Sequence, residues 1–197
     1  MVTSVSSLDR REAVARLLAR RDGLLVITGL GSPTYDAHAA GDHDGNFYLW
    51  GAMGSAALIG LGLAQAQPDR TVVAITGDGE QLMGLGGLAT IAISNPSNLV
   101  IIVIDNDHFG ETGMQKSHTG HGLDLATVAQ SCGFAEACTV RDMAGVEQVA
   151  RALHSPASGA RFFAIKVRAE NPPRSLPARD AVYIKNRFRA HLGLGTI

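Results

Sequence analysis

The segment from Thr71 to Gly113 constrains the fold more than any other part of the chain. A β-branched run, Thr71 to Thr76, ends in Gly77-Asp78-Gly79, and an apolar stretch of helical length follows it. A second β-branched run, Leu99 to Ile104, then ends in Asp105-Asn106-Asp107. This order predicts two parallel strands joined by a helix, with a polar loop at the carboxyl end of each strand. Open parallel sheets bind their ligands at that edge.

The two loop tips carry oxygen ligands suited to a hard cation. Mg²⁺ prefers octahedral oxygen coordination and commonly shares its shell with a phosphate. Asp78 would supply a charged oxygen, Asn106 an amide oxygen, and the backbone carbonyl of His108 a third ligand. We therefore predict a magnesium site formed by Asp78, Asn106 and His108.

The glycines beside Asp78 indicate that a phosphate binds next to the metal. Gly77 and Gly79 allow backbone N–H groups to come close to a ligand, and a helix opening near Glu80 would add its positive end. One diphosphate, held by the metal and the helix terminus, is the simplest ligand for this arrangement. Gly-Asp-Gly also occurs in ordinary turns, so the spacing to Asn106 carries the prediction.

Gly-Asp-Gly followed by Asn at the end of the next strand resembles the metal and diphosphate signature of thiamine diphosphate (ThDP) enzymes. A second segment, Asn46 to Gly54 (NFYLWGAMG), resembles the pyrimidine-binding stretch of ThDP-dependent decarboxylases. Within this family, the chain resembles the ThDP-binding part of sulfopyruvate and phosphonopyruvate decarboxylases, over roughly residues 24 to 167. The resemblance implies a diphosphate-binding domain that uses ThDP and Mg²⁺.

The resemblance also implies roles for individual residues. The Gly51 carbonyl would accept a hydrogen bond from the 4′-amino group of the pyrimidine, and the Met53 side chain would support the bent cofactor. The alternative for Met53 is a methionine of the hydrophobic core. Ser32, in the loop after the first strand, would donate its hydroxyl to the diphosphate, and Phe109 and Gly110 would contact the cofactor.

The segment from residue 107 to 122 is expected to be an active-site loop, because it is long and rich in polar residues and glycine. Relatives read close to TGxQPT, whereas this chain has TGMQKSHT at Thr112 to Thr119. The change leaves the substrate open among 2-oxo acids. Gln115 and His118 are candidate catalytic residues here, and His43 is a candidate substrate contact in a polar stretch from residue 35 to 46, which we expect to be a mobile loop.

Composition indicates a globular protein and excludes several classes. The chain has 197 residues, is 46% hydrophobic and 18% charged, and carries a net charge of −1. A disordered chain is excluded, and nothing favours nucleic-acid binding. Two cysteines form no disulfide or cluster pattern and are expected to be buried thiols. No stretch approaches the length of a membrane helix, so we expect a soluble, cytoplasmic protein.

The periodicity predicts an α/β fold: a single doubly wound domain over residues 1 to 197, with five or six mainly parallel strands and helices on both faces. Residues 1 to 7 are expected to be disordered. Strands are expected at residues 24 to 28, 71 to 76, 99 to 104, 135 to 140 and 161 to 167. Helices are expected at residues 8 to 21 (capped by Ser7), 54 to 67, 81 to 93, 124 to 132, 142 to 154 and 180 to 192.

A chain of this length has room for only one of the two α/β domains that the family uses. In the family, the glutamate that activates the pyrimidine belongs to the other domain. We therefore expect a hetero-oligomer, α2β2 or larger, with a pyrimidine-binding α-type subunit of similar size. The alternatives are a carboligase or 2-hydroxyacyl lyase subunit, a β-like subunit of a 2-oxoacid:ferredoxin oxidoreductase, and a non-catalytic ThDP-binding regulatory subunit.

Overall fold

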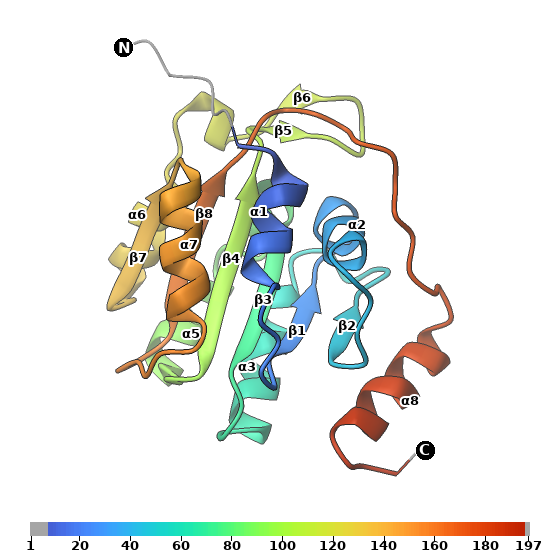
Figure 1. Cartoon of the computed structure of the whole chain (residues 1–197). Helices are drawn as coiled ribbons and strands as arrows, with labels where there is room; N and C mark the ends of the chain where they lie inside the picture. The colour runs from blue at the N-terminus through green and yellow to red at the C-terminus, as the bar shows by residue number, and fades with distance from the viewer. Residues whose placement is uncertain (1–7, 196–197) are drawn as a thin grey trace.

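A six-stranded parallel sheet forms the centre of the protein in the computed structural model, which describes residues 8 to 195 (Figure 1). The strand order is β2-β1-β3-β4-β8-β7 and every pairing is parallel. The strands, in that order, are Asn46–Tyr48, Leu25–Thr28, Val72–Gly77, Leu99–Asp105, Arg161–Lys166 and Glu136–Val140. The predicted doubly wound α/β fold is thus confirmed. Residues 1 to 7, for which disorder was expected, lie outside the described part.

Helices cover both faces of the sheet, which explains why its central strands are continuously apolar. One face carries α1 (Arg10–Leu17), α2 (Ser32–Ala39) and α7 (Met143–Ala152), and the other carries α3 (Ala56–Ala66), α5 (Gly87–Ser94) and α6 (Leu125–Cys132). All seven residues of β4 are buried. Within residues 8 to 195, no helix is long and apolar enough to cross a membrane.

The register of the central strands places the predicted loops side by side. Gly77 pairs with Ile104, and Asp105 pairs with Lys166 on the next strand. The loops that follow β3 and β4 therefore leave the sheet at the same edge, as the strand–helix–strand pattern predicted.

The stretch from residue 35 to 46 is not a loop throughout, which corrects our expectation. Its first part belongs to α2, in which Pro33 through Ala37 are buried. The polar residue Asp36 is completely buried and forms ion pairs with Arg10 and Arg11 of α1. From the sequence alone, Asp36 could not be told from a solvent-exposed loop residue, because its two arginine partners lie on another helix.

The apolar segment after Gly-Asp-Gly forms two short helices where one was expected. Helix α4 spans Asp78–Met83 and α5 begins at Gly87. Gly84 lies against Gly54, and a Cβ on Gly84 would come within 2.0 Å of the Gly54 carbonyl oxygen. This close approach of two backbones interrupts the helix.

The first helix begins later and ends earlier than expected. Asp9, instead of Ser7, caps α1 by accepting hydrogen bonds from the backbone N–H groups of Arg11 and Glu12. Ser7 lies outside the described residues. Asp124 and Asp142, the residues at which two helices were expected to begin, are the N-caps of α6 and α7. Both cysteines are free thiols, but neither is fully buried as expected: Cys132 is partly buried and Cys138 is exposed.

The segment between β4 and α6 folds over the carboxyl edge of the sheet. The short strands β5 (His108–Phe109) and β6 (Gln115–Lys116) pair as an antiparallel hairpin, and a 3-10 turn, η1, spans Thr119–His121. The segment expected to be an active-site loop is therefore partly ordered.

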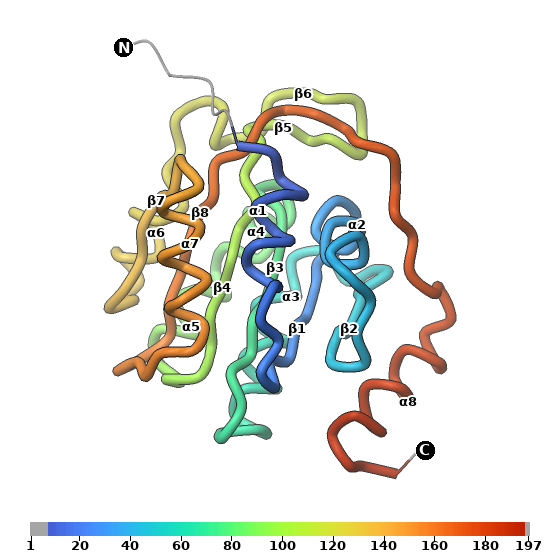
Figure 2. The backbone as a smooth tube through the Cα atoms, in the orientation of Figure 1, coloured from blue at the N-terminus to red at the C-terminus, as the bar shows by residue number. Residues whose placement is uncertain are grey.

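After β8, residues 168 to 180 form an extended strap that leads to α8 (Ala181–His191) at the edge of the sheet beside β2 (Figure 2). The strap crosses the end of the sheet near the hairpin and then descends past α2. His38 and Ser175 are hydrogen-bonded at 2.8 Å, and the Trp50 indole donates to the Ala178 carbonyl at 2.8 Å. Helix α8 then packs on β2, with the rings of Phe47 and Phe188 5.5 Å apart.

Candidate functional site

A cavity of about 180 Å³ opens at the carboxyl ends of the central strands. Ten of the residues proposed for cofactor or metal binding line it: Ser32, Met53, Gly77, Asp78, Gly79, Glu80, Asn106, His108, Phe109 and Gly110. Residues from β3, β4, α2 and the hairpin thus meet at one place although they are far apart in the sequence. Gly51 does not line the cavity, although Met53, two residues further on, does.

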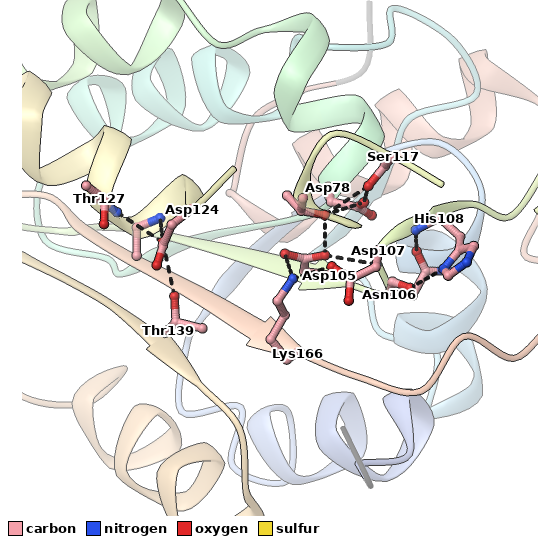
Figure 3. A network of polar contacts seen from close by, with 12 residues as sticks. Asp78, Asp105, Asn106, Asp107, His108, Ser117, Asp124, Thr127, Thr139 and Lys166 are labelled. Atoms are coloured by element: carbon pink, nitrogen blue, oxygen red, sulfur yellow. Dashed lines mark hydrogen bonds and ion pairs between the residues drawn. The ribbon is translucent and has the colours of Figure 1, made fainter. Parts of the chain in front are cut away.

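Asp78 is buried, with 3% of its surface exposed, and its side chain is oriented by two hydroxyl groups (Figure 3). Ser117 donates a hydrogen bond to Oδ2 of Asp78, and Thr119 lies 3.1 Å from the same oxygen. Burial, followed by the negative charge of Asp105, raises the pKa of Asp78 to about 6. A buried carboxylate held in this way is prepared for a cation.

A charged network continues from Asp78 across the sheet. The Thr119 hydroxyl lies 2.8 Å from Oδ1 of Asp105, and Lys166 on β8 donates to Oδ2 of Asp105 at 2.7 Å. Lys166 also forms an ion pair with Asp107. Figure 3 shows Lys166 on β8 pointing toward Asp105 and Asp107 at the end of β4, with Asp78 and Ser117 beside them. Lys166 compensates the charge of Asp105, so that Asp78 remains the carboxylate available at the cavity.

Asn106 and His108 form a compact turn at the end of β4. The Asn106 side-chain oxygen accepts from the His108 backbone N–H at 3.0 Å, and the His108 carbonyl accepts from the Gly110 backbone N–H at 3.1 Å. Each of these oxygens has a second lone pair that can bind a metal. Among residues 8 to 195, no group of three His, Cys, Asp or Glu side chains could hold a metal ion. A cation here would therefore depend on Asp78, neutral oxygens and the ligand's own phosphates.

Glu80 lines the cavity, but its carboxylate mainly contacts the loop that follows β1. One oxygen accepts from the Thr76 hydroxyl at 2.9 Å, and the other is buried without a hydrogen-bond partner among the described residues. A Cβ on Gly29 would collide with Glu80. Burial raises the pKa of Glu80. The glycine at position 29 therefore allows the loop after β1 to pass over this carboxyl group.

Met53 projects toward solvent at the apolar end of the cavity. Its surface is 46% exposed, so the alternative of a core methionine is wrong. It follows Ala52, which has a positive φ of 53°, and precedes Gly54, which packs against Met83. This tight turn presents the Met53 side chain at the mouth, where it can support a bound ring.

Three proposed catalytic residues lie away from the cavity. The His43 ring nitrogen accepts from the Gly45 backbone N–H at 2.9 Å, just before β2 begins, at the opposite edge of the sheet. This position corrects the expectation that His43 contacts a substrate in the cavity. Gln115 and His118 are exposed on the hairpin and the turn after it and do not line the cavity, so their catalytic roles remain predictions.

Sequence reasoning missed Arg10, Ser117, Thr119 and Lys166. The two hydroxyl residues flank His118, which drew attention because its chemistry is more distinctive. Arg10 lies on α1, nearly seventy positions before Asp78, in a segment for which only a helix was predicted. Its side chain is only 5% exposed and lines the cavity beside Ser32.

Three comparisons with known proteins agree on the family and the fold. Residues 34–167 match the model of the thiamine pyrophosphate enzyme, C-terminal TPP binding domain. The sulfopyruvate decarboxylase subunit beta of Methanocaldococcus jannaschii is 43% identical over 110 residues, which are 56% of this chain and 58% of that protein. The chain thus spans somewhat more than half of this relative.

A longer alignment and a solved structure extend the similarity. The sulfopyruvate decarboxylase subunit beta of Methanococcus maripaludis is 32% identical over 183 residues, covering 92% of this chain and 96% of that subunit. The structure of a thiamine diphosphate-dependent 4-hydroxybenzoylformate decarboxylase from Rhodococcus jostii RHA1 has a TM-score of 0.69 and 19% identity. It covers 87% of this chain and 34% of that one, which supports the fold.

Proposed function

Because the chain belongs to the thiamine pyrophosphate enzymes, through their C-terminal TPP-binding domain, we propose that it is the ThDP- and Mg²⁺-binding subunit of a heteromeric 2-oxo acid decarboxylase. The proposed substrate is an anionic 2-oxo acid of the sulfopyruvate or phosphonopyruvate kind. The observation that carries the proposal is the convergence of Asp78 and Asn106 on one cavity. The whole chain is proposed to be one such domain, with residues 107 to 122 as its active-site segment, in a cytoplasmic enzyme.

The residues around the cavity fit a magnesium diphosphate. Asp78 contributes a buried charged oxygen, and the Asn106 amide and the His108 carbonyl contribute neutral ones. Gly77 lines the cavity, and a Cβ at this position would find no atom closer than 4.0 Å, so the backbone leaves room for a phosphate. This set of hard oxygens suits Mg²⁺ better than it suits a softer transition metal.

When bound, ThDP supplies a carbon nucleophile for the 2-oxo group and an electron sink for the decarboxylation. The residues of this chain fix its position. Asp78, oriented by Ser117 and Thr119, would hold the metal and through it the diphosphate, while the exposed Met53 would support the ring end. Phe109 also lines the cavity, with its ring against Gly79. A fixed cofactor lowers the barrier because the reacting groups are already aligned.

The carboxylates of this chain leave the proton relay incomplete. Of the acidic residues that line the cavity, Asp78 faces the metal site, Glu80 bonds Thr76, and Glu111 pairs with Arg174 at 2.8 Å. The activating glutamate is therefore proposed to come from a pyrimidine-binding partner of similar size.

A surface for this partner is proposed to begin at the cavity, which Met53 and Met83 line, and to continue along α3 and α5. Met53, Leu58, Met83 and Ile93 are large apolar residues that remain 40% or more exposed. Residues 81 to 104 contain no charged side chain. An uncharged, partly apolar surface at the edge of an incomplete site favours burial against a second subunit.

The proposal is tested by measuring decarboxylation of a panel of 2-oxo acids by the chain alone and by the chain co-expressed with its partner. We expect turnover only in the complex, and Asp78→Ala is expected to abolish it. Turnover by the isolated chain would contradict the shared site. Product analysis separates the decarboxylase from a carboligase or lyase, and a ferredoxin-linked assay tests the oxidoreductase alternative. Unchanged turnover in the Asp78→Ala complex would support a non-catalytic regulatory subunit.

A further inference from the structure

Arg10 reaches the candidate cofactor site from a helix that carries none of the recognised motifs. Helix α1 lies on the same face of the sheet as α2 (Figure 1). The Arg10 side chain is 5% exposed and lines the same cavity as Asp78 and Asn106. A buried arginine at a ligand cavity needs a compensating anion.

The charge of Arg10 is only partly compensated within the described residues. Its Nε lies 3.2 Å from Asp36, but Arg11 also approaches this carboxylate, at 3.4 Å. The single buried carboxylate of Asp36 is therefore shared by two guanidinium groups. The Nε of Arg10 is buried without a hydrogen-bond acceptor of good geometry. The carboxylates of Glu111 and Asp9 also attract Arg10, but they form ion pairs with Arg174 and Arg168.

The position of Arg10 indicates which part of a ligand it meets. Its Nη1 donates to the hydroxyl of Ser32, the first residue of α2. Met53 and Met83, which also line the cavity, come from the opposite face of the sheet and form the apolar end. Arg10 and Ser32 therefore belong to the polar end of the cavity, where a phosphate fits better than a ring.

The charge of a bound magnesium diphosphate is a further reason to expect a positively charged side chain at the polar end of the cavity. A diphosphate carries more negative charge than one divalent ion neutralises, and Asp78 adds a further negative charge. A guanidinium group matches phosphate oxygens in geometry as well as in charge. A positive charge beside the metal would offset part of this negative excess.

We propose that Arg10 binds the terminal phosphate of ThDP, with its guanidinium held in place by Asp36 and Ser32. This inference rests on the proposed function, since it assumes that the cavity holds a magnesium diphosphate. It adds a cofactor-binding residue on α1 to the loops that follow β1, β3 and β4.

The test uses the full chain and measures binding of inorganic pyrophosphate with Mg²⁺ by calorimetry. Arg10→Met is expected to weaken binding on the order of 10- to 100-fold, because a charge-assisted hydrogen bond is lost. Arg10→Gln, which keeps a polar group for Ser32, is expected to show a similar loss and covers the case in which Arg10→Met does not fold. Arg11→Met is the matched control, because Arg11 contacts the same carboxylate but does not line the cavity. It is expected to bind pyrophosphate like the wild type.

The outcomes separate this inference from the proposed function. If Asp78→Ala abolishes pyrophosphate binding and neither Arg10 variant changes it, the inference about Arg10 is wrong and the metal–diphosphate site stands. If the Arg10 variants bind pyrophosphate normally but raise the KM for the 2-oxo acid in the complex, Arg10 serves the substrate and the inference is overturned. If the wild-type chain binds no pyrophosphate with Mg²⁺, the proposed function fails together with the inference. Equal losses in the Arg10 and Arg11 variants would indicate a structural effect and would also overturn it.

Discussion

Replacing Asp78 with Asn is expected to stabilise the metal-free chain while it removes the proposed metal site. Asp78 is almost completely buried, and its pKa of about 6 lies above the ordinary value of 3.8. Ionisation of this carboxyl group therefore costs the folded state free energy that the unfolded chain does not lose. Asn has nearly the same shape, still accepts hydrogen bonds from Ser117 and Thr119, and carries no charge.

The magnitude follows from the two pKa values. The difference between about 6 and 3.8 corresponds to about 3 kcal/mol at roughly 1.4 kcal/mol per pH unit. Because the pKa of Asp78 is higher in the folded state than in the unfolded chain, ionisation of Asp78 does not destabilise the fold below about pH 4. The loss of stability grows between about pH 4 and 6 and reaches its full value above that pH. Above pH 7, Asp78→Asn should thus raise the free energy of unfolding by about 3 kcal/mol, which corresponds to an increase in the midpoint of thermal unfolding of roughly 6 to 12 °C.

The assay is denaturant unfolding with a chelator present, from pH 4.5 to 8, for the wild type and Asp78→Asn. Asp69→Asn, at an exposed carboxylate in a turn, is the control and should change little at any pH. Adding Mg²⁺ with ThDP should stabilise the wild type and not the variant. A variant that is less stable than the wild type at pH 8, or a stability difference that does not vary with pH, would refute the reasoning.

Two further substitutions test the surroundings of the site. Lys166→Met leaves Asp105 buried without its ion-pair partner and should lower the free energy of unfolding by about 3 to 5 kcal/mol. Lys166→Arg is the control that preserves the charge. Equal stability of Lys166→Met and the wild type would contradict the role assigned to this ion pair. Gly84→Ala places a Cβ against the Gly54 carbonyl and should lower the free energy of unfolding by more than about 3 kcal/mol. Gly62 lies within α3 with open space around it, so Gly62→Ala should raise the free energy of unfolding by about 0.5 to 1 kcal/mol. Both glycine variants are compared by thermal unfolding, and similar effects of the two would exclude backbone contact as the cause.

The parts of the fold that could be predicted are those written in local patterns. The β-branched runs gave β3 and β4 to within a residue, and Asp124 and Asp142 marked helix starts because an N-cap is a local contact. The adjacency of the loops after β3 and β4 followed from the predicted parallel strand–helix–strand order. These features need no information from distant residues.

The parts that could not be predicted depend on partners far along the chain. Helix α2 looks polar because of Asp36, whose partners Arg10 and Arg11 lie about 25 residues earlier. The hydroxyl of Ser117 bonds Asp78 across 39 positions, and sequence alone does not reveal which of the polar residues in its segment turns inward. Gly84 interrupts a helix because of its contact with Gly54, which becomes visible only once the two backbones are packed.

The strap of residues 168 to 180 joins regions that the sheet itself keeps apart. Near its start Asn171 donates to the Gly110 carbonyl at 3.2 Å, and near its end Ala178 accepts from Trp50. A ligand that draws the hairpin inward would therefore pull on the segment that positions the last helix. Ligand binding at the hairpin would then also shift α8, so a probe attached to α8 would report occupancy of a cavity that α8 does not line.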